Sequence, residues 1–172
     1  MTLHYDVFKT KLGWMAVIVS SKGIRRTTLP QPTPEDCLTA LGNDVRDAML
    51  IDTPLSELRK KLDDYFQGKP VAFDQPLDYA DARPFSKAAW EACRSIPDGE
   101  TRSYAWLAAQ AGRPGAPRAA GQAMARNPLP ILVPCHRVVA SDGSLCGFGS
   151  GKNALALKQQ LLDLDRKRAK AA

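Results

Sequence analysis

The segment 127–139 constrains the fold more than any other part of the chain, because an irregular break divides it into two apolar runs. Residues 131–133 and 138–139 are aliphatic and β-branched, which is typical of buried strands. Pro134 lies between the runs, has no backbone N–H to donate to a sheet and forces an irregular backbone. The chain must therefore leave regular structure here, and it presents Cys135 at the break.

Cys135 is followed directly by His136 and Arg137. Cationic or proton-accepting neighbours lower the pKa of a thiol, and the thiolate is its nucleophilic form. This pattern predicts that Cys135 is a nucleophile with a lowered pKa. The alternative is a buried cysteine that acts as a small hydrophobic residue. The prolines at positions 128, 130 and 134 fit that alternative less well.

The composition is that of an ordinary globular protein of one large or two small domains. The 172 residues are 44% hydrophobic and 24% charged, which excludes a disordered chain. The start of the chain lacks a signal-peptide pattern and no apolar run is long enough to span a membrane, so we expect a cytoplasmic protein without membrane contact. The four cysteines show no zinc-like spacing, which predicts free thiols and no metal site.

The net charge of +6 is unevenly distributed. Residues 83–172 contain 14 Lys and Arg against 6 Asp and Glu, a balance of +8, whereas residues 1–82 contain 10 against 12, a balance of −2. A basic half indicates a polyanionic partner for the C-terminal part. Charge alone is equally compatible with a solvated surface and a solubilising basic tail.

The first 82 residues have the pattern of a small α+β domain. Alternating and β-branched residues predict antiparallel strands within 3–29, separated by turns. A helix is expected over 34–41, and a second from Pro54 to Phe66 with Thr53 as its N-cap. The irregular residues that follow predict a link between domain 1–82 and domain 83–172.

The second half has a helical pattern. Helices are predicted over 85–96, 104–111 and 116–125. The last two are joined by a short connection rich in glycine, which is the pattern of a helix-turn-helix unit. Small residues on its second helix would let the backbone approach a partner closely. An ordinary alanine-rich helical hairpin packed on the core has the same spacing.

Four stretches in this half together resemble one family, the O6-alkylguanine-DNA alkyltransferases. They are Ile-Pro-Asp-Gly-Glu-Thr-Arg-Ser-Tyr at 96–104, Ala-Gly-Arg-Pro-Gly-Ala-Pro-Arg-Ala-Ala-Gly at 111–121, the stretch 127–139 with its Pro-Cys-His-Arg core, and Asp-Gly-Ser-Leu-Cys-Gly-Phe at 142–148. The resemblance covers roughly residues 84–165. It implies an α+β protein with a small N-terminal antiparallel sheet and helices. A mainly helical C-terminal domain follows, with a helix-turn-helix and the active-site cysteine.

The resemblance also implies a function. Such proteins bind double-stranded DNA that contains O6-alkylguanine or O4-alkylthymine, rotate the damaged nucleotide out of the duplex and move its alkyl group to a cysteine. The thioether is stable, so each molecule acts once. The expected protein is a monomer that needs no cofactor and no metal.

Carried onto this sequence, the resemblance assigns residues by role. Cys135 is the alkyl acceptor, His136 relays a proton through a water, and Asp165 occupies the position of a glutamate that orients the histidine. The remaining catalytic roles fall to Asn127, which braces the turn, and Tyr104, which rotates the nucleotide and protonates the leaving guanine. Expected DNA contacts are the intercalating Arg118 together with Ala116, Ala119, Ala120, Gly121, Arg126 and Arg137. Expected pocket residues are Pro134, Val138, Phe148 and Gly149.

The sequence departs from the family at several positions. Pro117 replaces an alanine, Phe148 replaces a tyrosine, Asp165 is one methylene shorter than glutamate, and about three extra residues follow Gly151. A defective relay at Asp165 would favour a protein that binds the lesion without transfer. A cysteine hydrolase is a further alternative, although adjacent Cys and His side chains do not face each other in an extended segment.

Overall fold

The division of the chain into two compact units is the first feature of the computed structural model, which describes residues 1–80, 82–148 and 154–172. The units are Met1–Ala80 and Asp81–Ala172. The boundary predicted from the sequence, between residues 82 and 83, falls two residues further along. Within the described ranges no helix is long and apolar enough to cross a membrane.

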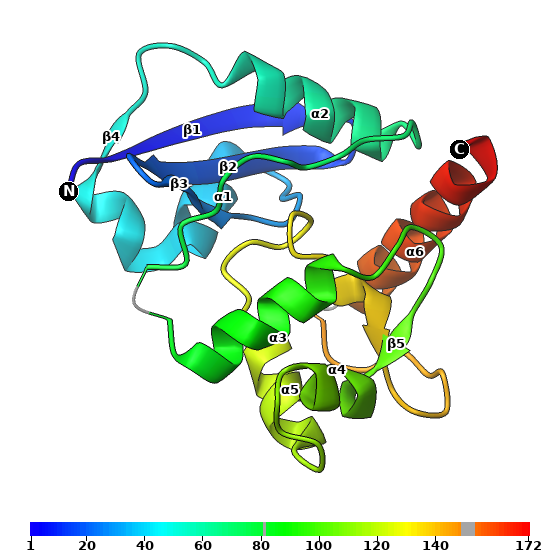
Figure 1. Cartoon of the computed structure of the whole chain (residues 1–172). Coiled ribbons are helices and arrows are strands. Elements are labelled where there is room, and N and C mark those ends of the chain that lie inside the picture. The colour runs from blue at the N-terminus through cyan, green and yellow to red at the C-terminus, as the bar shows by residue number, and fades with distance from the viewer. Residues whose placement is uncertain (81, 149–153) are drawn as a thin grey trace. The chain divides into compact units, whose positions relative to one another are not determined.

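The first unit is built on a four-stranded sheet (Figure 1). The strands β1 (Leu3–Thr10), β2 (Gly13–Ser20) and β3 (Gly23–Thr27) are antiparallel, as the alternating pattern predicted. The strand order is β3-β2-β1-β4, and β4 (Ala48–Leu50) pairs with β1 in parallel. The sheet is therefore mixed rather than purely antiparallel. β4 escaped prediction because three partly exposed residues carry no detectable periodicity.

Two helices cover opposite faces of this sheet (Figure 1). Helix α1 (Pro34–Leu41) begins at the predicted residue, and the Thr33 side chain caps it; a 3-10 turn, η1 (Gly42–Asp47), follows. Ala16 and Ile18 of β2 pack with α1 in a buried cluster. The alternate residues of the sheet face helix α2 (Ser56–Phe66), whose Arg59 stacks on Phe8 of β1.

The start of α2 differs from the prediction. The helix begins at Ser56, and Leu55 rather than Thr53 occupies the capping position. The buried Asp6 of β1 takes over the role expected of a local cap, because its carboxylate accepts a hydrogen bond from the Leu55 backbone N–H at 3.4 Å and pairs with Arg59. A residue 49 positions away in sequence thus fixes the helix end, which local signals cannot show.

The second unit is mainly helical. Helices α3 (Pro84–Arg94), α4 (Tyr104–Gln110) and α5 (Pro117–Ala125) pack against one another (Figure 1). The Trp90 indole of α3 donates a hydrogen bond to the Ala123 carbonyl of α5 at 2.9 Å. The remaining elements are β5 (Arg102–Ser103), which is parallel to β6 (Val138–Val139), the 3-10 turn η2 (Cys135–Arg137) and helix α6 (Ala154–Ala171).

Helices α4 and α5 form the predicted helix-turn-helix pair. The Ser103 hydroxyl accepts a hydrogen bond from the Trp106 backbone N–H at 3.1 Å and so caps α4, and Pro117 occupies the first turn of α5. The connection turns sharply at Gly112 and Gly115, whose φ angles of 89° and 94° favour glycine. The two helices are in contact with each other.

Candidate active site

The turn that carries Cys135 is held by the side chain of Asn127. Its amide nitrogen donates to the Val133 carbonyl and its oxygen accepts from the Leu129 backbone N–H, both at 2.9 Å. Between these points Ile131 is buried with a φ of 75°, a conformation that β-branched residues rarely adopt. Such local strain persists only where the surroundings impose it, and it is common beside functional groups. The Asn127 side chain therefore holds the backbone before Cys135 at two points, Leu129 and Val133.

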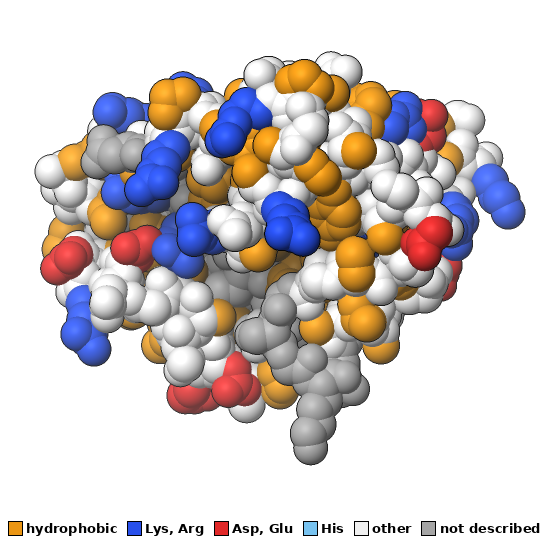
Figure 2. Space-filling view, turned by 90° about the horizontal axis from the view of Figure 1, so that it is seen from below, with side chains coloured by type: hydrophobic (Ala, Val, Ile, Leu, Met, Phe, Trp, Pro, Cys, Tyr) orange, Lys and Arg blue, Asp and Glu red, His pale blue; other side chains and the backbone are white. Residues whose placement is uncertain are grey.

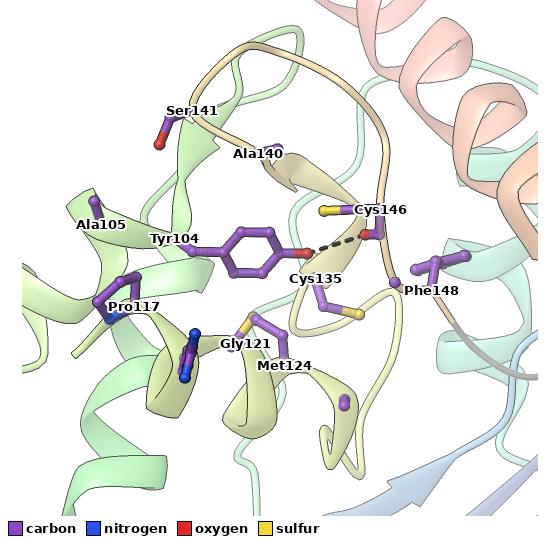
Figure 3. Close-up of a pocket in the computed structure, with 13 residues that line it drawn as sticks. Tyr104, Ala105, Pro117, Gly121, Met124, Cys135, Ala140, Ser141, Cys146 and Phe148 are labelled. Carbon is purple, nitrogen blue, oxygen red and sulfur yellow. Dashed lines mark hydrogen bonds between the residues drawn. The ribbon is translucent and has the colours of Figure 1, made fainter.

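The Cys135 side chain lines a pocket of about 780 Å³ (Figure 3). Its wall is formed by α4, α5 and the segment that follows β6. The lining residues that matter for the chemistry are Tyr104, Arg118, Gly121, Cys135, Cys146 and Phe148. The Tyr104 hydroxyl reaches across and donates a hydrogen bond to the Cys146 carbonyl at 3.1 Å. The pocket thus presents two free thiols, the half-buried Cys135 and the exposed Cys146, together with a phenol and apolar walls.

The resting Cys135 thiol is less acidic than the sequence predicted. Burial raises its pKa above the usual value for a cysteine, and the hydrogen bond with Asn127 and the positive charge of Lys158 offset only part of this effect. The guanidinium of Arg137, the cation nearest in sequence, pairs with Asp165. At neutral pH the thiol is protonated and needs an acceptor for its proton before it can act as a nucleophile.

The neighbouring His136 has a ring nitrogen that can accept a proton. Its imidazole is fully buried, and Nε2 lies 2.9 Å from Oδ2 of Asp165 on α6. A carboxylate accepts hydrogen bonds only, so Nε2 carries the hydrogen and Nδ1 is the proton-accepting nitrogen. Burial lowers the pKa of His136 despite the opposing contact with Asp165, which keeps the ring neutral at pH 7.

Asp165 is the centre of a buried ionic cluster, which we define as Asp165, Arg137, Arg168 and Asp98. Arg137 binds both carboxylate oxygens of Asp165, through Nε at 2.7 Å and Nη2 at 3.2 Å, and Arg168 binds Oδ1 through Nη2. Both arginines also pair with Asp98. Burial raises the pKa of Asp165, but the hydrogen bonds from His136 and Arg137 outweigh it and hold that pKa well below its usual range.

The assignment of Arg137 to the DNA contacts is therefore wrong. The residue is 8% exposed, and it also donates a hydrogen bond to the Ile96 carbonyl at 2.7 Å. It follows a buried histidine in η2, and its side chain turns inward to the cluster. Adjacency to Cys135 in sequence did not reveal this direction.

Lys158 is a buried cation that the sequence reasoning missed. Its ammonium donates hydrogen bonds to the Val138 carbonyl at 2.7 Å and the Cys146 carbonyl at 3.2 Å, and it lies 5.8 Å from the centre of the Phe148 ring. Burial lowers its pKa. The Cys146 carbonyl thus accepts from both Lys158 and Tyr104, and these two donors fix the wall of the pocket opposite α5.

The sequence did contain a signal that Lys158 is buried, in the helical spacing of the residues around it. The buried positions of α6 are Lys158, Leu161, Leu162, Asp165 and Arg168, which share one face at helical spacing. Three charged residues on the apolar stripe of a helix indicate buried ion pairs, since charged side chains are rarely buried without partners.

Two family profiles together match most of the chain. The profile described as "6-O-methylguanine DNA methyltransferase, ribonuclease-like domain" matches residues 3–79, and that described as "6-O-methylguanine DNA methyltransferase, DNA binding domain" matches residues 84–167. The chain belongs to the 6-O-methylguanine DNA methyltransferase family.

Individual members of this family match over almost the whole chain. A constitutive methylated-DNA–protein-cysteine methyltransferase of Bacillus subtilis is 37% identical over 164 residues, 95% of each chain. The crystal structure of the Mycobacterium tuberculosis O6-methylguanine methyltransferase superimposes with a TM-score of 0.81 at 31% identity, covering 99% of this chain and 97% of that one. A structure of the M. tuberculosis protein in complex with DNA gives a TM-score of 0.79 at 32% identity, covering 96% and 94%.

The DNA-contact residues expected from the family resemblance are not all placed alike on α5. Arg118 and Gly121 line the pocket, and Arg126 is exposed at the end of the helix. Ala116 and Ala119 are half-buried. Ala120 is fully buried in the core of the unit, so its place among the DNA contacts is wrong. A helix with small residues on all sides gives no sequence signal for which of them face inward.

The expected pocket residues divide in the same way. Phe148 lines the pocket, whereas Pro134 and Val138 are buried behind Cys135 and do not line it. Gly149 and the extra residues near Gly151 lie outside the described residues. In the described part of the chain, no group of three or more His, Cys, Asp or Glu side chains is placed to hold a metal ion.

Proposed function

We propose that this protein repairs DNA by moving an alkyl group from O6 of guanine to Sγ of Cys135, once per molecule. The observation that carries the proposal is a half-buried thiol at a pocket, backed by a buried His136–Asp165 pair at 2.9 Å, in a chain of the 6-O-methylguanine DNA methyltransferase family. The contact to Asp165 also removes the reason to favour a lesion-binding protein without transfer.

The proton of the Cys135 thiol passes through a water to Nδ1 of His136. The imidazolium that forms is stabilised by Asp165, which holds Nε2–H. The thiolate attacks the alkyl carbon, so that an S–C bond forms as the C–O6 bond breaks and its electron pair passes to guanine. A thioether does not release its alkyl group under mild conditions, and the protein is consumed by one reaction.

The leaving guanine takes up a proton, and we assign the donor role to Tyr104. Burial raises the pKa of this phenol, so it stays protonated at neutral pH and remains a donor. Its hydroxyl is bound to the Cys146 carbonyl in the free protein. When a guanine enters the pocket, the Tyr104 hydroxyl donates to N3 of the guanine instead of to the Cys146 carbonyl.

Access to O6 requires that the nucleotide leaves the base stack, since the atom is otherwise hidden from a protein side chain. Helix α5 supplies the means, because Arg118 is exposed at its first turn beside the pocket. A side chain inserted into the duplex offsets part of the cost of unstacking. Figure 2 shows several Lys and Arg side chains among exposed apolar ones on one face of the molecule, and such cations can neutralise phosphates.

The test of the function is a direct measurement of alkyl transfer. We expect wild-type protein mixed with a duplex containing one O6-methylguanine to gain the mass of one methyl group, located on Cys135 by peptide mapping. Repaired DNA should not exceed protein in molar amount. Repeated turnover, or a methyl group on Cys93 or Cys146, would contradict the proposal. The monomeric state and cytoplasmic location stay predictions.

A substitution at Arg118 separates base rotation from chemistry. We expect Arg118→Ala to slow transfer from duplex DNA by about 10-fold or more while leaving reaction with free O6-benzylguanine near the wild-type rate, because a free base needs no unstacking. Tyr104→Ala should also lose more activity on the duplex than on the free base. Single-turnover rates on both substrates measure the difference.

Arg126→Ala is the matched control for Arg118→Ala. Arg126 is an exposed arginine at the opposite end of α5 and is not among the residues that line the pocket. Its loss should weaken duplex binding, most at low salt, and make that binding less sensitive to salt, but it should not slow transfer once the DNA is saturated with protein. Equal losses by Arg118→Ala on the duplex and on the free base would assign Arg118 to the chemical step instead.

A further inference from the structure

The buried ionic cluster contains an arginine that the proposed chemistry does not use. Arg168 lies near the end of α6, and its side chain is fully buried. It binds Oδ1 of Asp165 one turn earlier on the same helix, and Nε lies 3.4 Å from Oδ1 of Asp98. Burying a long cationic side chain costs free energy unless charged partners compensate, so its position needs an explanation.

The cluster joins two positive and two negative charges. Asp165 is 1% exposed and accepts from His136, Arg137 and Arg168, whereas Asp98 is about one-third exposed and accepts from both arginines. The four formal charges sum to zero. Without Arg168 the remaining three would carry one net negative charge directly behind His136, and a buried negative charge favours the protonated form of a nearby imidazole.

We propose that Arg168 is a positioning residue of the alkyl-acceptor site: together with Arg137 it holds Asp165 and balances its charge, so that His136 stays neutral with its hydrogen on Nε2. The inference rests on the proposed function. Arg168 touches neither substrate nor thiol, and it acts on Cys135 only through Asp165 and His136. A neutral His136 can receive the thiol proton, whereas an imidazolium cannot.

The charged groups around His136 support this assignment. The titratable and charged groups on the elements packed around it are Asp165, Arg168 and Lys158 on α6, Arg137 and Cys135 in η2, Cys93 on α3, and Asp98 in the segment after α3. The positive charges of Arg137 and Arg168 both lower the pKa of His136, in the same direction as burial, and Asp165 opposes them. Arg168 is therefore one of two cations that act with burial, the largest cause, against the contact with Asp165.

Because the side chain of Asp165 is short, its carboxylate has to be positioned by its partners, and Arg168 is one of them. Arg137 reaches both oxygens of Asp165 from η2, the same turn that carries His136. Arg168 binds Oδ1 from within α6, so the carboxylate is held from two elements and Oδ2 remains aimed at Nε2. This arrangement compensates for the missing methylene.

The experiment follows the ring of His136 directly by nitrogen NMR. The chain contains two histidines, so His4 serves as an internal reference. In wild type we expect a neutral His136 with hydrogen on Nε2. In Arg168→Met the midpoint of His136 protonation should rise by about one pH unit, a tenfold change in proton affinity, because a positive charge has been removed. The acid limb of the rate–pH profile for alkyl transfer should move in the same direction.

Three further variants make the result specific. Arg168→Lys keeps the charge and should return the midpoint toward wild type. Asp98→Asn removes a negative charge from a partly exposed position and should move the midpoint down. Arg166→Met is the matched control, because Arg166 is an exposed arginine on the same helix that pairs with Asp163 and should leave His136 unchanged.

The inference fails if folded Arg168→Met shows the wild-type midpoint and tautomer of His136. If Arg168→Met does not fold, Asp98→Asn decides, and an unchanged midpoint in that variant overturns the charge balance. These outcomes are independent of alkyl transfer. Wild-type protein that does not methylate itself would refute the proposed function, while the NMR shifts would still test Arg168.

Discussion

Cys135→Ser is expected to abolish removal of O6-methylguanine from DNA. A serine hydroxyl is far less acidic than a thiol, and His136 with its lowered pKa is too weak a base to generate an alkoxide. An oxygen nucleophile is also less reactive toward an alkyl carbon than a soft thiolate. The variant should bind lesion-containing duplex with near wild-type affinity, because the substitution removes no charged group. Intact-mass spectrometry and quantification of the remaining lesion measure the result.

Cys146→Ser is the matched control, because Cys146 also lines the pocket and carries an exposed free thiol. Its backbone carbonyl, not its thiol, makes the contacts with Tyr104 and Lys158, so serine should preserve them. We expect Cys146→Ser to methylate itself at close to the wild-type rate. Loss of transfer in this variant with retention in Cys135→Ser would exchange the two assignments.

Local sequence signals predicted the helical part of the fold well. The apolar spacing of α3, α4 and α5, the Ser103 cap and Pro117 at the first turn all act within a few residues of one another. The start of α2 depended instead on Asp6, which comes from a strand far away in sequence. Propensity describes what a segment prefers in isolation, and a distant charged partner can move a boundary by a residue or two.

The site illustrates the same limit for side-chain direction. Cys135 was predictable because Pro134 breaks the apolar run, and Asp165 was predictable only through the family resemblance. Arg137 was assigned to DNA through the family resemblance, but its partners Asp98 and Asp165 come from segments 39 and 28 residues away. No spacing rule links them, because the contact depends on how α6 packs against η2.

The prediction of a lowered pKa for the Cys135 thiol was wrong for a related reason. The sequence shows which groups are neighbours along the chain, whereas the pKa of a thiol depends first on burial and then on where nearby charges point. Burial raises the pKa of Cys135, and the nearest sequence cation is engaged with carboxylates. The mechanism that we propose therefore uses proton transfer to His136 at the moment of reaction rather than a thiolate at rest.

That dependence makes Asp165→Asn the second substitution with a large expected effect. The carboxylate is the contact that raises the pKa of His136, while burial, Arg137 and Arg168 lower it. Its removal leaves only the lowering effects, so the pKa of His136 falls further and the imidazolium is no longer stabilised. Cys135 then loses its proton acceptor, and alkyl transfer at neutral pH should fall by roughly 100-fold or more, the usual contribution of a general base.

The pH dependence of Asp165→Asn has a definite sign. Without a competent acceptor the thiol must ionise by itself, and burial raises its pKa, so the rate should increase into the alkaline range and the apparent pKa of Cys135 should rise. DNA affinity should change little, because Asp165 is buried on α6 and the DNA contacts are assigned to α5. Single-turnover rates across pH, together with duplex binding, measure both effects.

Stability must be separated from chemistry in this variant, since losing one member of a buried ionic group typically costs about 3–5 kcal/mol of unfolding free energy. Rates are therefore expressed per folded molecule, with thermal unfolding recorded alongside. Asp163→Asn is the matched control: Asp163 is exposed, pairs with Arg166 at 3.0 Å on the same helix and should leave rate and pH profile unchanged. Asp165→Glu keeps the charge and should retain much of the activity. Identical profiles for wild type and Asp165→Asn would show that another group orients His136.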